Sequence, residues 1–202
     1  MSFVSIVIAN SFVSVMTDSR TSELNSDGTI YRVKSEDYPK IFSLSDNAFI
    51  AMAGLVEDAQ EFIECSRLKQ AILEHGLLKE KYEITKWLES VRQHIITDYN
   101  FKVFFGGLTI TNELKVYIIN SKIKELAELE YSENEIGYYL SPSQYIDKGW
   151  VENLFKELYR LYDGTPETMK VVQELLNDIV ANSDESVNKN KRWFCLRRSL
   201  IN

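Results

Sequence analysis

The sequence places a serine, an aspartate, a lysine and a glycine where they could support nucleophilic chemistry. Ser2 directly follows Met1, and Asp18 lies 16 positions after Ser2. Lys40 follows a long polar stretch, and Gly54 lies 14 positions beyond Lys40. A serine hydroxyl is a weak nucleophile until a base takes its proton. If Met1 is removed, the α-amino group of Ser2 can be that base, because a free α-amine titrates near about pH 7.7–8.0.

Two apolar hairpins are expected to position these residues. The first pairs Ser2–Ile8 with Phe12–Met16 across the small, polar residues 9–11. The second pairs Ile41–Leu44 with Ala48–Ala53. Both faces of the first hairpin are largely apolar, so we expect a sheet that is covered on both sides.

A polar excursion at residues 21–39 separates the two hairpins, and one short strand is expected in it at Thr29–Val33. After Gly54, apolar residues recur at helical spacing up to Gly76 and predict a helix there. Thr165 and Pro166 form a helix start, with the threonine as N-cap. Further elements are expected as a helix at 84–96, strands at 103–110, 114–120, 124–131 and 137–140, helices at 144–162 and 166–181, and a strand at 192–198.

This order of elements predicts the fold class. Strands, two helices, strands, two helices and a strand do not alternate one by one, which argues against a doubly wound parallel sheet. We therefore expect an α+β fold in a single domain of residues 1–202. Two antiparallel sheets with a helix pair over each outer face, a four-layer αββα sandwich, would bury both hairpins.

The motifs of the first 54 residues resemble the start of proteasome β-subunits, which belong to the N-terminal-nucleophile (Ntn) hydrolases. The matching segments are Ser2-Phe3-Val4-Ser5-Ile6, Met16-Thr17-Asp18-Ser19-Arg20-Thr21, Lys40-Ile41-Phe42 and Ala51-Met52-Ala53-Gly54. The spacing from Ser2 to Asp18, and from Lys40 to Gly54, is that of the family.

The resemblance implies a role for each residue. Lys40 would lower the pKa of the Ser2 hydroxyl, and Asp18 would hold the lysine ammonium in place. Gly54 would donate its backbone N–H to the developing oxyanion, where one donor contributes about 2.7–4 kcal/mol. The implied activity is cleavage of a peptide or another amide through an acyl-enzyme, without a cofactor or metal. Because the family stacks its subunits in rings, a homo-oligomer is also implied.

The sequence departs from the family pattern in several places. The stretch between Asp18 and Lys40 is about six residues longer, so that a gap-free count would place the lysine at Lys34. We prefer Lys40, because only Lys40 is followed by the strand and the Met-Ala-Gly turn. Serine replaces the usual threonine nucleophile. The family's Gly/Ser-rich turn and Asp-x-x-Ser-Gly segment have only loose counterparts at 141–143 and 182–186, where Asp184 is the candidate aspartate.

Each of these residues also has a purely structural interpretation. Ser2 is a common second residue, Asp18 could cap a turn and pair with Arg20, Lys40 could be solvated, and Gly54 could serve only a tight turn. The alternative function is therefore a catalytically inactive, proteasome-like scaffold that acts as a binding or assembly module.

Composition excludes several other classes. The 202 residues carry 23 Lys and Arg against 30 Asp and Glu, a net charge of −7, which argues against a general nucleic-acid binder. Two isolated cysteines, Cys65 and Cys195, indicate a reducing compartment, and no apolar run is long enough to cross a membrane. We expect a cytoplasmic protein. His75, expected at a helix C-terminus, and His94 lack neighbours at metal-ligand spacing, which argues against a zinc site.

Overall fold

The computed structural model describes residues 2–25, 30–92, 100–122, 125–133, 135–143 and 145–198. The described part of the chain falls into two compact units. The first unit is built mainly from the N-terminal hairpin, the excursion that follows it and the last third of the chain. The second unit is built mainly from the middle of the chain.

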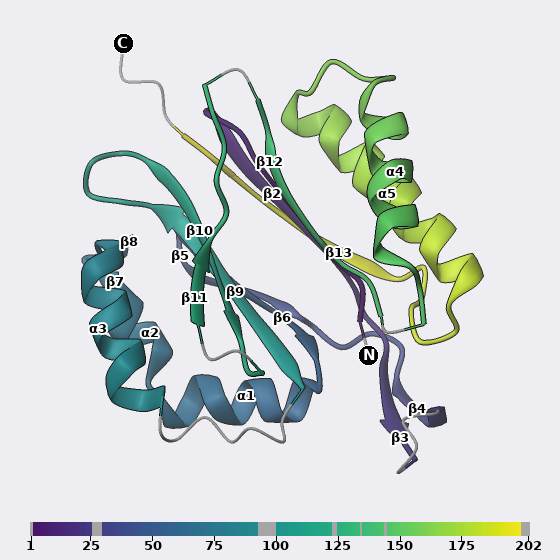
Figure 1. The fold of residues 1–202 in the computed structure, drawn as a ribbon, viewed down its shortest axis with the longest axis horizontal. Helices are drawn as coiled ribbons and strands as arrows, with labels where there is room; N and C mark the ends of the chain where they lie inside the picture. Colours follow the sequence, from purple (N-terminus) through teal and green to yellow (C-terminus); the bar gives the residue numbers. More distant parts are fainter. Residues whose placement is uncertain are drawn as a thin grey trace. The chain divides into compact units, whose positions relative to one another are not determined.

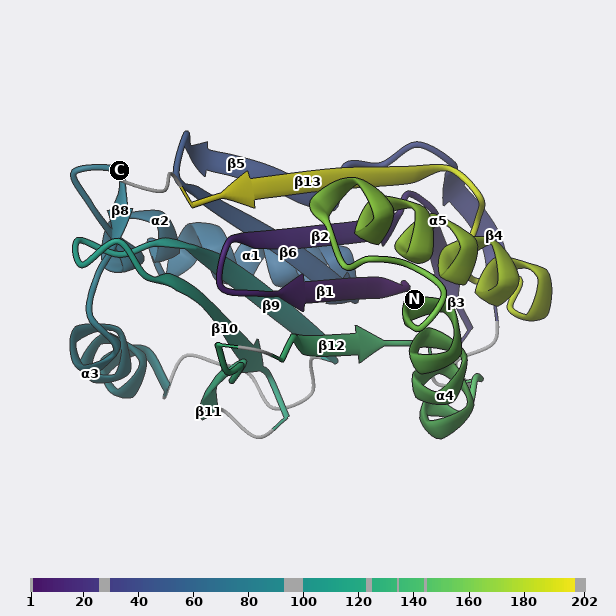
Figure 2. The same cartoon turned by 90° about the horizontal axis from the view of Figure 1, so that it is seen from above.

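The first unit contains a four-stranded sheet in which the N-terminal hairpin is central. Its strands are β12 (Gly137–Ser141), β1 (Val4–Ile8), β2 (Phe12–Asp18) and β13 (Lys191–Arg197), in that order (Figure 2). Every residue of β1 and β2 is buried, in keeping with the apolar character of both strand faces.

Two helices of the first unit, α4 (Lys148–Tyr159) and α5 (Pro166–Ser183), pack on each other beside this sheet (Figure 1). The predicted start of α5 is confirmed, because the Thr165 side chain accepts a hydrogen bond from the Thr168 N–H. Such a cap satisfies one of the backbone donors that the first helical turn leaves unpaired.

A buried glutamine on α5 links this helix to both strands of the hairpin. Gln173 donates to the Ser5 carbonyl at 2.9 Å and accepts from the Ser14 hydroxyl at 2.5 Å. The Trp193 indole N–H donates to the same hydroxyl at 2.8 Å. Since a buried polar group without a partner is costly, these contacts fix the register of α5 on the sheet.

The excursion between the hairpins forms a small sheet of its own in the first unit. It pairs β3 (Thr21–Leu24) with β4 (Ile30–Ser35) antiparallel. The strand β4 is the one that the sequence predicts at Thr29–Val33, and Thr29 itself lies outside the described residues.

The second unit contains a five-stranded sheet. Its order is β11 (Glu125–Glu128), β10 (Leu114–Asn120), β9 (Phe101–Leu108), β6 (Ala48–Gly54) and β5 (Ile41–Ser45). The pairs β11–β10, β10–β9 and β9–β6 are antiparallel. The helix α1 (Val56–Cys65) packs against β6 and β9, and its buried side chains include Ala59 and Phe62.

The prediction of one long helix that continues up to Gly76 is wrong. After α1 the chain forms a short helix α2 (Leu68–Ile72) and a two-stranded hairpin of β7 (Leu73–Glu74) and β8 (Leu77–Leu78). Arg67 (φ 51°) ends the first helical run in the left-handed region, and His75 (φ 52°) and Gly76 (φ 78°) form the hairpin turn. His75 is thus a turn residue and not the end of a helix.

The next helix is α3 (Lys81–Val91), and the remainder of the predicted helix, residues 93–96, lies outside the described residues. Lys81 on α3 and Lys115 on β10 bind the Glu128 carboxylate at 2.9 and 2.8 Å. Burial alone would raise the pKa of Glu128, but these two lysines hold it below its usual value.

Candidate active site

Asp18 is the centre of a buried polar cluster at the end of β2. Its Oδ1 accepts the backbone N–H of Phe3 at 2.8 Å, and its Oδ2 accepts the backbone N–H of Arg20 at 3.0 Å. The side chain is fully buried. The hairpin geometry explains the first contact, because the end of β2 lies beside the start of β1 and the Asp18 N–H donates to the Phe3 carbonyl.

Lys40 is the ionic partner of Asp18. Its Nζ lies 3.0 Å from both carboxylate oxygens and 2.5 Å from the Arg20 carbonyl oxygen, and its side chain is also fully buried. Lys34, the other candidate, is exposed on β4. The structure therefore places Lys40, and not Lys34, on Asp18.

Burial acts in opposite directions on the two partners. It raises the pKa of the Asp18 carboxyl, against the charge and hydrogen bonds of Lys40 and the backbone N–H groups of Phe3 and Arg20. It lowers the pKa of the Lys40 ammonium, against the attraction of Asp18. A buried charge needs a partner and hydrogen bonds to stay ionised, and this pair supplies both.

Ser2 lies immediately before this cluster in the chain. It is 3% exposed, and among the described groups its Oγ has no hydrogen-bond partner. The next residue, Phe3, donates to Asp18, so the backbone that carries Ser2 is anchored on the ion pair. Met1 lies outside the described residues.

Asp184 is also a buried residue of the first unit, at the C-cap of α5. Its Oδ1 accepts the Ser186 N–H at 2.8 Å, and its Oδ2 accepts the Ser143 hydroxyl. The two segments that the sequence offers as loose counterparts of the family's motifs therefore meet. The Ser186 hydroxyl is buried and has no partner among the described residues.

Gly54 belongs to the second unit, where it ends β6 opposite Phe101. Its φ is +87°, and a Cβ built on it would lie 2.2 Å from the Asn100 carbonyl oxygen. Only glycine fits this backbone without strain, since other residues rarely adopt this φ. The strand end accounts for the glycine in structural terms, while its role as an oxyanion donor stays a prediction.

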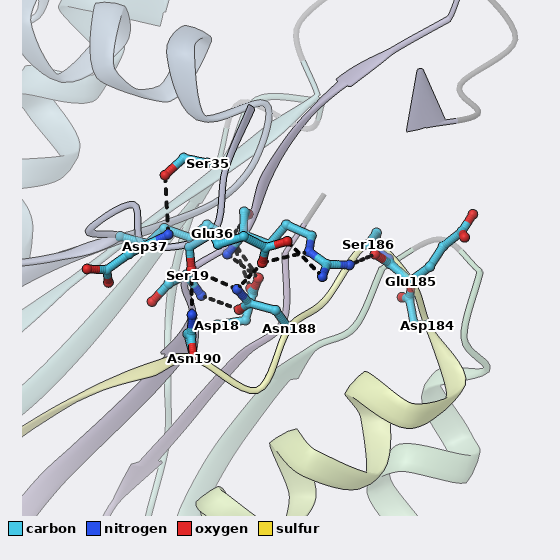
Figure 3. Close-up of polar contacts among 12 residues, drawn as sticks. Asp18, Ser19, Ser35, Glu36, Asp37, Asp184, Glu185, Ser186, Asn188 and Asn190 are labelled. Atoms are coloured by element: carbon cyan, nitrogen blue, oxygen red, sulfur yellow. Dashed lines mark hydrogen bonds and ion pairs between the residues drawn. The ribbon is translucent and has the colours of Figure 1, made fainter. Parts of the chain in front are cut away.

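Polar residues that sequence reasoning missed surround the Asp18-Ser19-Arg20 segment (Figure 3). Glu36 binds the Arg20 guanidinium, with 3.0 Å between Oε1 and an Arg20 terminal nitrogen. Asn188 accepts the Ser19 N–H at 3.1 Å and donates to the Glu36 carboxylate at 2.7 Å. No spacing in the sequence indicates these contacts, because Asn188 and Glu36 are 152 positions apart.

A family model described as Proteasome subunit matches residues 7–120, which is more than half of the 202-residue chain. The chain belongs to the proteasome subunit family. No curated protein gives a significant match to the sequence.

Solved structures with the same fold cover nearly the whole chain. Eukaryotic HslV from Trypanosoma brucei is 12% identical, with a TM-score of 0.67 over 96% of this chain and 99% of that chain. Anbu (ancestral beta-subunit) from Yersinia bercovieri is 16% identical, with a TM-score of 0.66 over 96% and 80%. An Anbu (Gly-1) mutant from Hyphomicrobium sp. strain MC1 is 13% identical, with a TM-score of 0.69 over 100% and 89%.

The family and these structures confirm the predicted fold class, the α+β, proteasome-like Ntn-hydrolase fold. In the described part of the chain, no three His, Cys, Asp or Glu side chains gather where they could hold a metal ion, and His94 lies outside that part. None of the described helices is long and apolar enough to span a membrane.

Proposed function

We propose that this proteasome subunit family member is an N-terminal serine hydrolase that cleaves a peptide or another amide after removal of Met1. The observation that carries the proposal is the buried Asp18–Lys40 pair, whose carboxylate also binds the N–H of Phe3. One carboxylate thereby orients the lysine and anchors the backbone next to the nucleophile. The Ser2 hydroxyl beside it is buried and has no partner among the described groups.

In the proposed reaction, the Ser2 Oγ attacks the amide carbon while its proton passes to the free α-amine of Ser2. The α-amine then gives this proton to the leaving nitrogen, the C–N bond breaks, and an ester to Ser2 remains. Water hydrolyses the ester and restores the hydroxyl. Gly54 is proposed as the N–H donor to the oxyanion.

Lys40 is proposed to stabilise the Ser2 alkoxide. A lysine ammonium has three donors, and two of the three Lys40 contacts go to the same carboxylate. Exchanging one of them for the Ser2 hydroxyl leaves the ammonium bound to Asp18 and to the Arg20 carbonyl. Asp184, held by Ser143, is the proposed support of the free α-amine.

A covalent probe tests the proposal. Protein whose N-terminus is shown by mass to be Ser2 is treated with a β-lactone, and we expect an adduct of one probe per chain. The Ser2→Ala variant should give none, while Lys34→Ala, which changes the exposed lysine, should label like wild type. Absence of the adduct on wild-type protein with a free Ser2 amine would refute the proposal, as would retention of Met1 throughout the native population.

The second candidate function is an inactive scaffold for binding or assembly. The hydrogen bonds of Lys40 favour this candidate. Among the described residues, all three go to Asp18 and Arg20 and none goes to Ser2. A measured amidase activity that disappears in Ser2→Ala would rule the scaffold out.

Under both candidates we propose a cytoplasmic homo-oligomer, on the basis of the family and of the cysteine content. Sedimentation of the purified protein as a monomer at working concentration would contradict the oligomer.

A further inference from the structure

Arg20 connects the buried ion pair to polar groups at the surface of the first unit. Its backbone N–H donates to Asp18 and its backbone carbonyl accepts from Lys40. Its guanidinium donates to both oxygens of Glu36, through Nε at 3.1 Å and a terminal nitrogen at 3.0 Å. Such a two-pronged contact fixes the plane of the guanidinium as well as its distance. Holding the Arg20 side chain therefore restrains the two peptide groups on which the ion pair depends.

Asn188 provides a second connection from Glu36 to the same segment. Its side-chain oxygen accepts the Ser19 N–H, and its side-chain nitrogen donates to the Glu36 carboxylate at 2.7 Å and to the Glu36 carbonyl at 2.8 Å. Asn188 is itself buried, and its carbonyl accepts from the buried Asn177 side chain on α5. Asn188, which lies between α5 and β13, is thus held to α5 by a hydrogen bond.

Glu36 occupies the point where the long excursion returns to the site. It lies four residues before Lys40 and follows β4 directly. The Tyr38 N–H donates to the Ser19 carbonyl at 2.8 Å, so the returning chain is also bound to the segment after Asp18. Hydrogen bonds to Arg20 and Asn188 hold the pKa of Glu36 below its usual value.

We propose that Glu36 is a positioning residue that sets the geometry of Asp18 and Lys40 through Arg20, with Asn188 as its second contact. The inference deepens the proposed function and rests on it. The excursion between Arg20 and Lys40 is long, so the chain connection alone does not fix where its end lies. The Glu36 carboxylate fixes where that end meets the Asp18-Ser19-Arg20 segment.

The experiment compares Glu36→Gln with the matched control Glu23→Gln in protein that begins at Ser2. Glu23 also binds an arginine, Arg32, at 3.0 Å within the same excursion, and its side chain is 39% exposed against 50% for Glu36. The two glutamates differ in that Glu36 contacts Arg20 and Asn188. The first readout is labelling of Ser2 by the β-lactone, resolved into the maximal rate kinact and the half-saturating concentration KI.

We expect Glu36→Gln to lower kinact about ten- to a hundredfold and to leave KI within about twofold, because misplacement of reacting groups costs rate more than binding. Glu23→Gln should label like wild type. Labelling of Glu36→Gln at the wild-type kinact would overturn the inference. All variants are measured where circular dichroism shows them to be folded, so that loss of fold does not mimic loss of geometry.

A second readout does not depend on activity. Amide exchange at Phe3 and Arg20, whose N–H groups donate to Asp18, is followed by NMR. We expect faster exchange at both amides in Glu36→Gln and no change in Glu23→Gln. If the β-lactone does not label wild-type protein, the proposed function is refuted, and the amide exchange at Phe3 and Arg20 then tests the positioning role of Glu36 by itself. Unchanged protection in Glu36→Gln would then reject it.

A rescue variant separates positioning from simple loss of charge. Asn188→Asp alone faces the Glu36 carboxylate with a second carboxylate and should slow labelling. In Glu36→Gln with Asn188→Asp, the new amide can donate to the new carboxylate, which restores the contact with its polarity reversed. We expect the double variant to label faster than Asn188→Asp. A double variant that labels no faster than Asn188→Asp would contradict the proposed contact.

Discussion

Replacing Lys40 with methionine keeps much of the buried side chain's volume and removes its charge, together with the hydrogen bonds to Asp18 and to the Arg20 carbonyl. The Asp18 carboxylate then retains the N–H groups of Phe3 and Arg20 but loses its counter-charge in a fully buried site. Removing one partner of a buried ion pair costs about 3–5 kcal/mol. A domain has about 5–15 kcal/mol of stability in total, so the loss in Lys40→Met should be plain in urea unfolding at pH 7. Lys34→Met, on the exposed β4 position, should change stability by about 0.5 kcal/mol or less.

The stability difference between Lys40→Met and wild type should depend on pH, because Asp18 titrates differently in the two proteins. Without Lys40, burial raises the folded-state pKa of Asp18 further above the unfolded value of about 3.9. The folded protein then binds a proton more readily than the unfolded chain, so its stability rises as pH falls toward that unfolded pKa. The deficit of Lys40→Met relative to wild type should therefore shrink between pH 7 and about pH 5.

A second variant isolates the uncompensated charge. Asp18→Asn combined with Lys40→Met removes both charges and keeps an acceptor for the Phe3 N–H, so it should be more stable at pH 7 than Lys40→Met alone. The reasoning is refuted if the free energy of unfolding of Lys40→Met lies within about 1 kcal/mol of the wild-type value at pH 7, because a buried, unpaired carboxylate should destabilise the fold by more than that.

Three further predictions concern the scaffold, each measured by urea unfolding. Gly54→Ala should destabilise by about 2–4 kcal/mol, because its φ of +87° and close carbonyl neighbour admit no side chain. Gly149→Ala in the first turn of α4 should change stability by less than about 1 kcal/mol, because the nearest atom to its new Cβ is the Asp147 side-chain oxygen at 3.3 Å. Glu128→Gln should cost about 0.5–1 kcal/mol of stability at pH 7. Because the two lysines lower the pKa of Glu128, this cost should vanish as pH falls below about 4, and a cost that does not change with pH would contradict the prediction. Gln173→Leu should cost about 1–3 kcal/mol, because the buried Ser14 hydroxyl loses its acceptor and the Ser5 carbonyl loses a donor. The exposed Gln70→Leu should cost about 0.5 kcal/mol or less, and equal effects of the two variants would rule out the buried network as the cause.

The elements that the sequence predicts well are those whose local pattern and final environment agree. The N-terminal hairpin is apolar on both faces and is wholly buried, and Thr165 caps the helix that its position indicates. The resemblance to proteasome β-subunits implies the pairing of Asp18 with Lys40. The strand and the Met-Ala-Gly turn after Lys40 favour it over Lys34, the lysine that a gap-free count would give. Their catalytic roles, and the single-domain assignment, stay predictions.

The elements that it predicts poorly depend on contacts distant in sequence. Apolar residues recur at helical spacing from Leu55 to Ile72, yet the chain turns at Arg67 and again at His75-Gly76. Apolar residues would be buried at similar intervals in one continuous helix and in the observed series of α1, α2 and the β7–β8 hairpin. The periodicity of the sequence therefore does not reveal where the helix ends. The contact between Glu36 and Asn188 leaves no local pattern at all, since an exposed glutamate in a polar excursion looks like any solvated charge.

The central place of the N-terminal hairpin in its sheet has a consequence for synthesis of the protein. Both strands that flank it, β12 and β13, come from the last third of the chain. At ribosomal rates of about 5–20 residues per second, the hairpin emerges on the order of ten seconds before β12 can pair with it. During that interval two of the most apolar strands of the chain present open edges, which are templates for association with other chains. The nascent hairpin is therefore a segment that chaperones would have to protect until β12 and β13 have been synthesised.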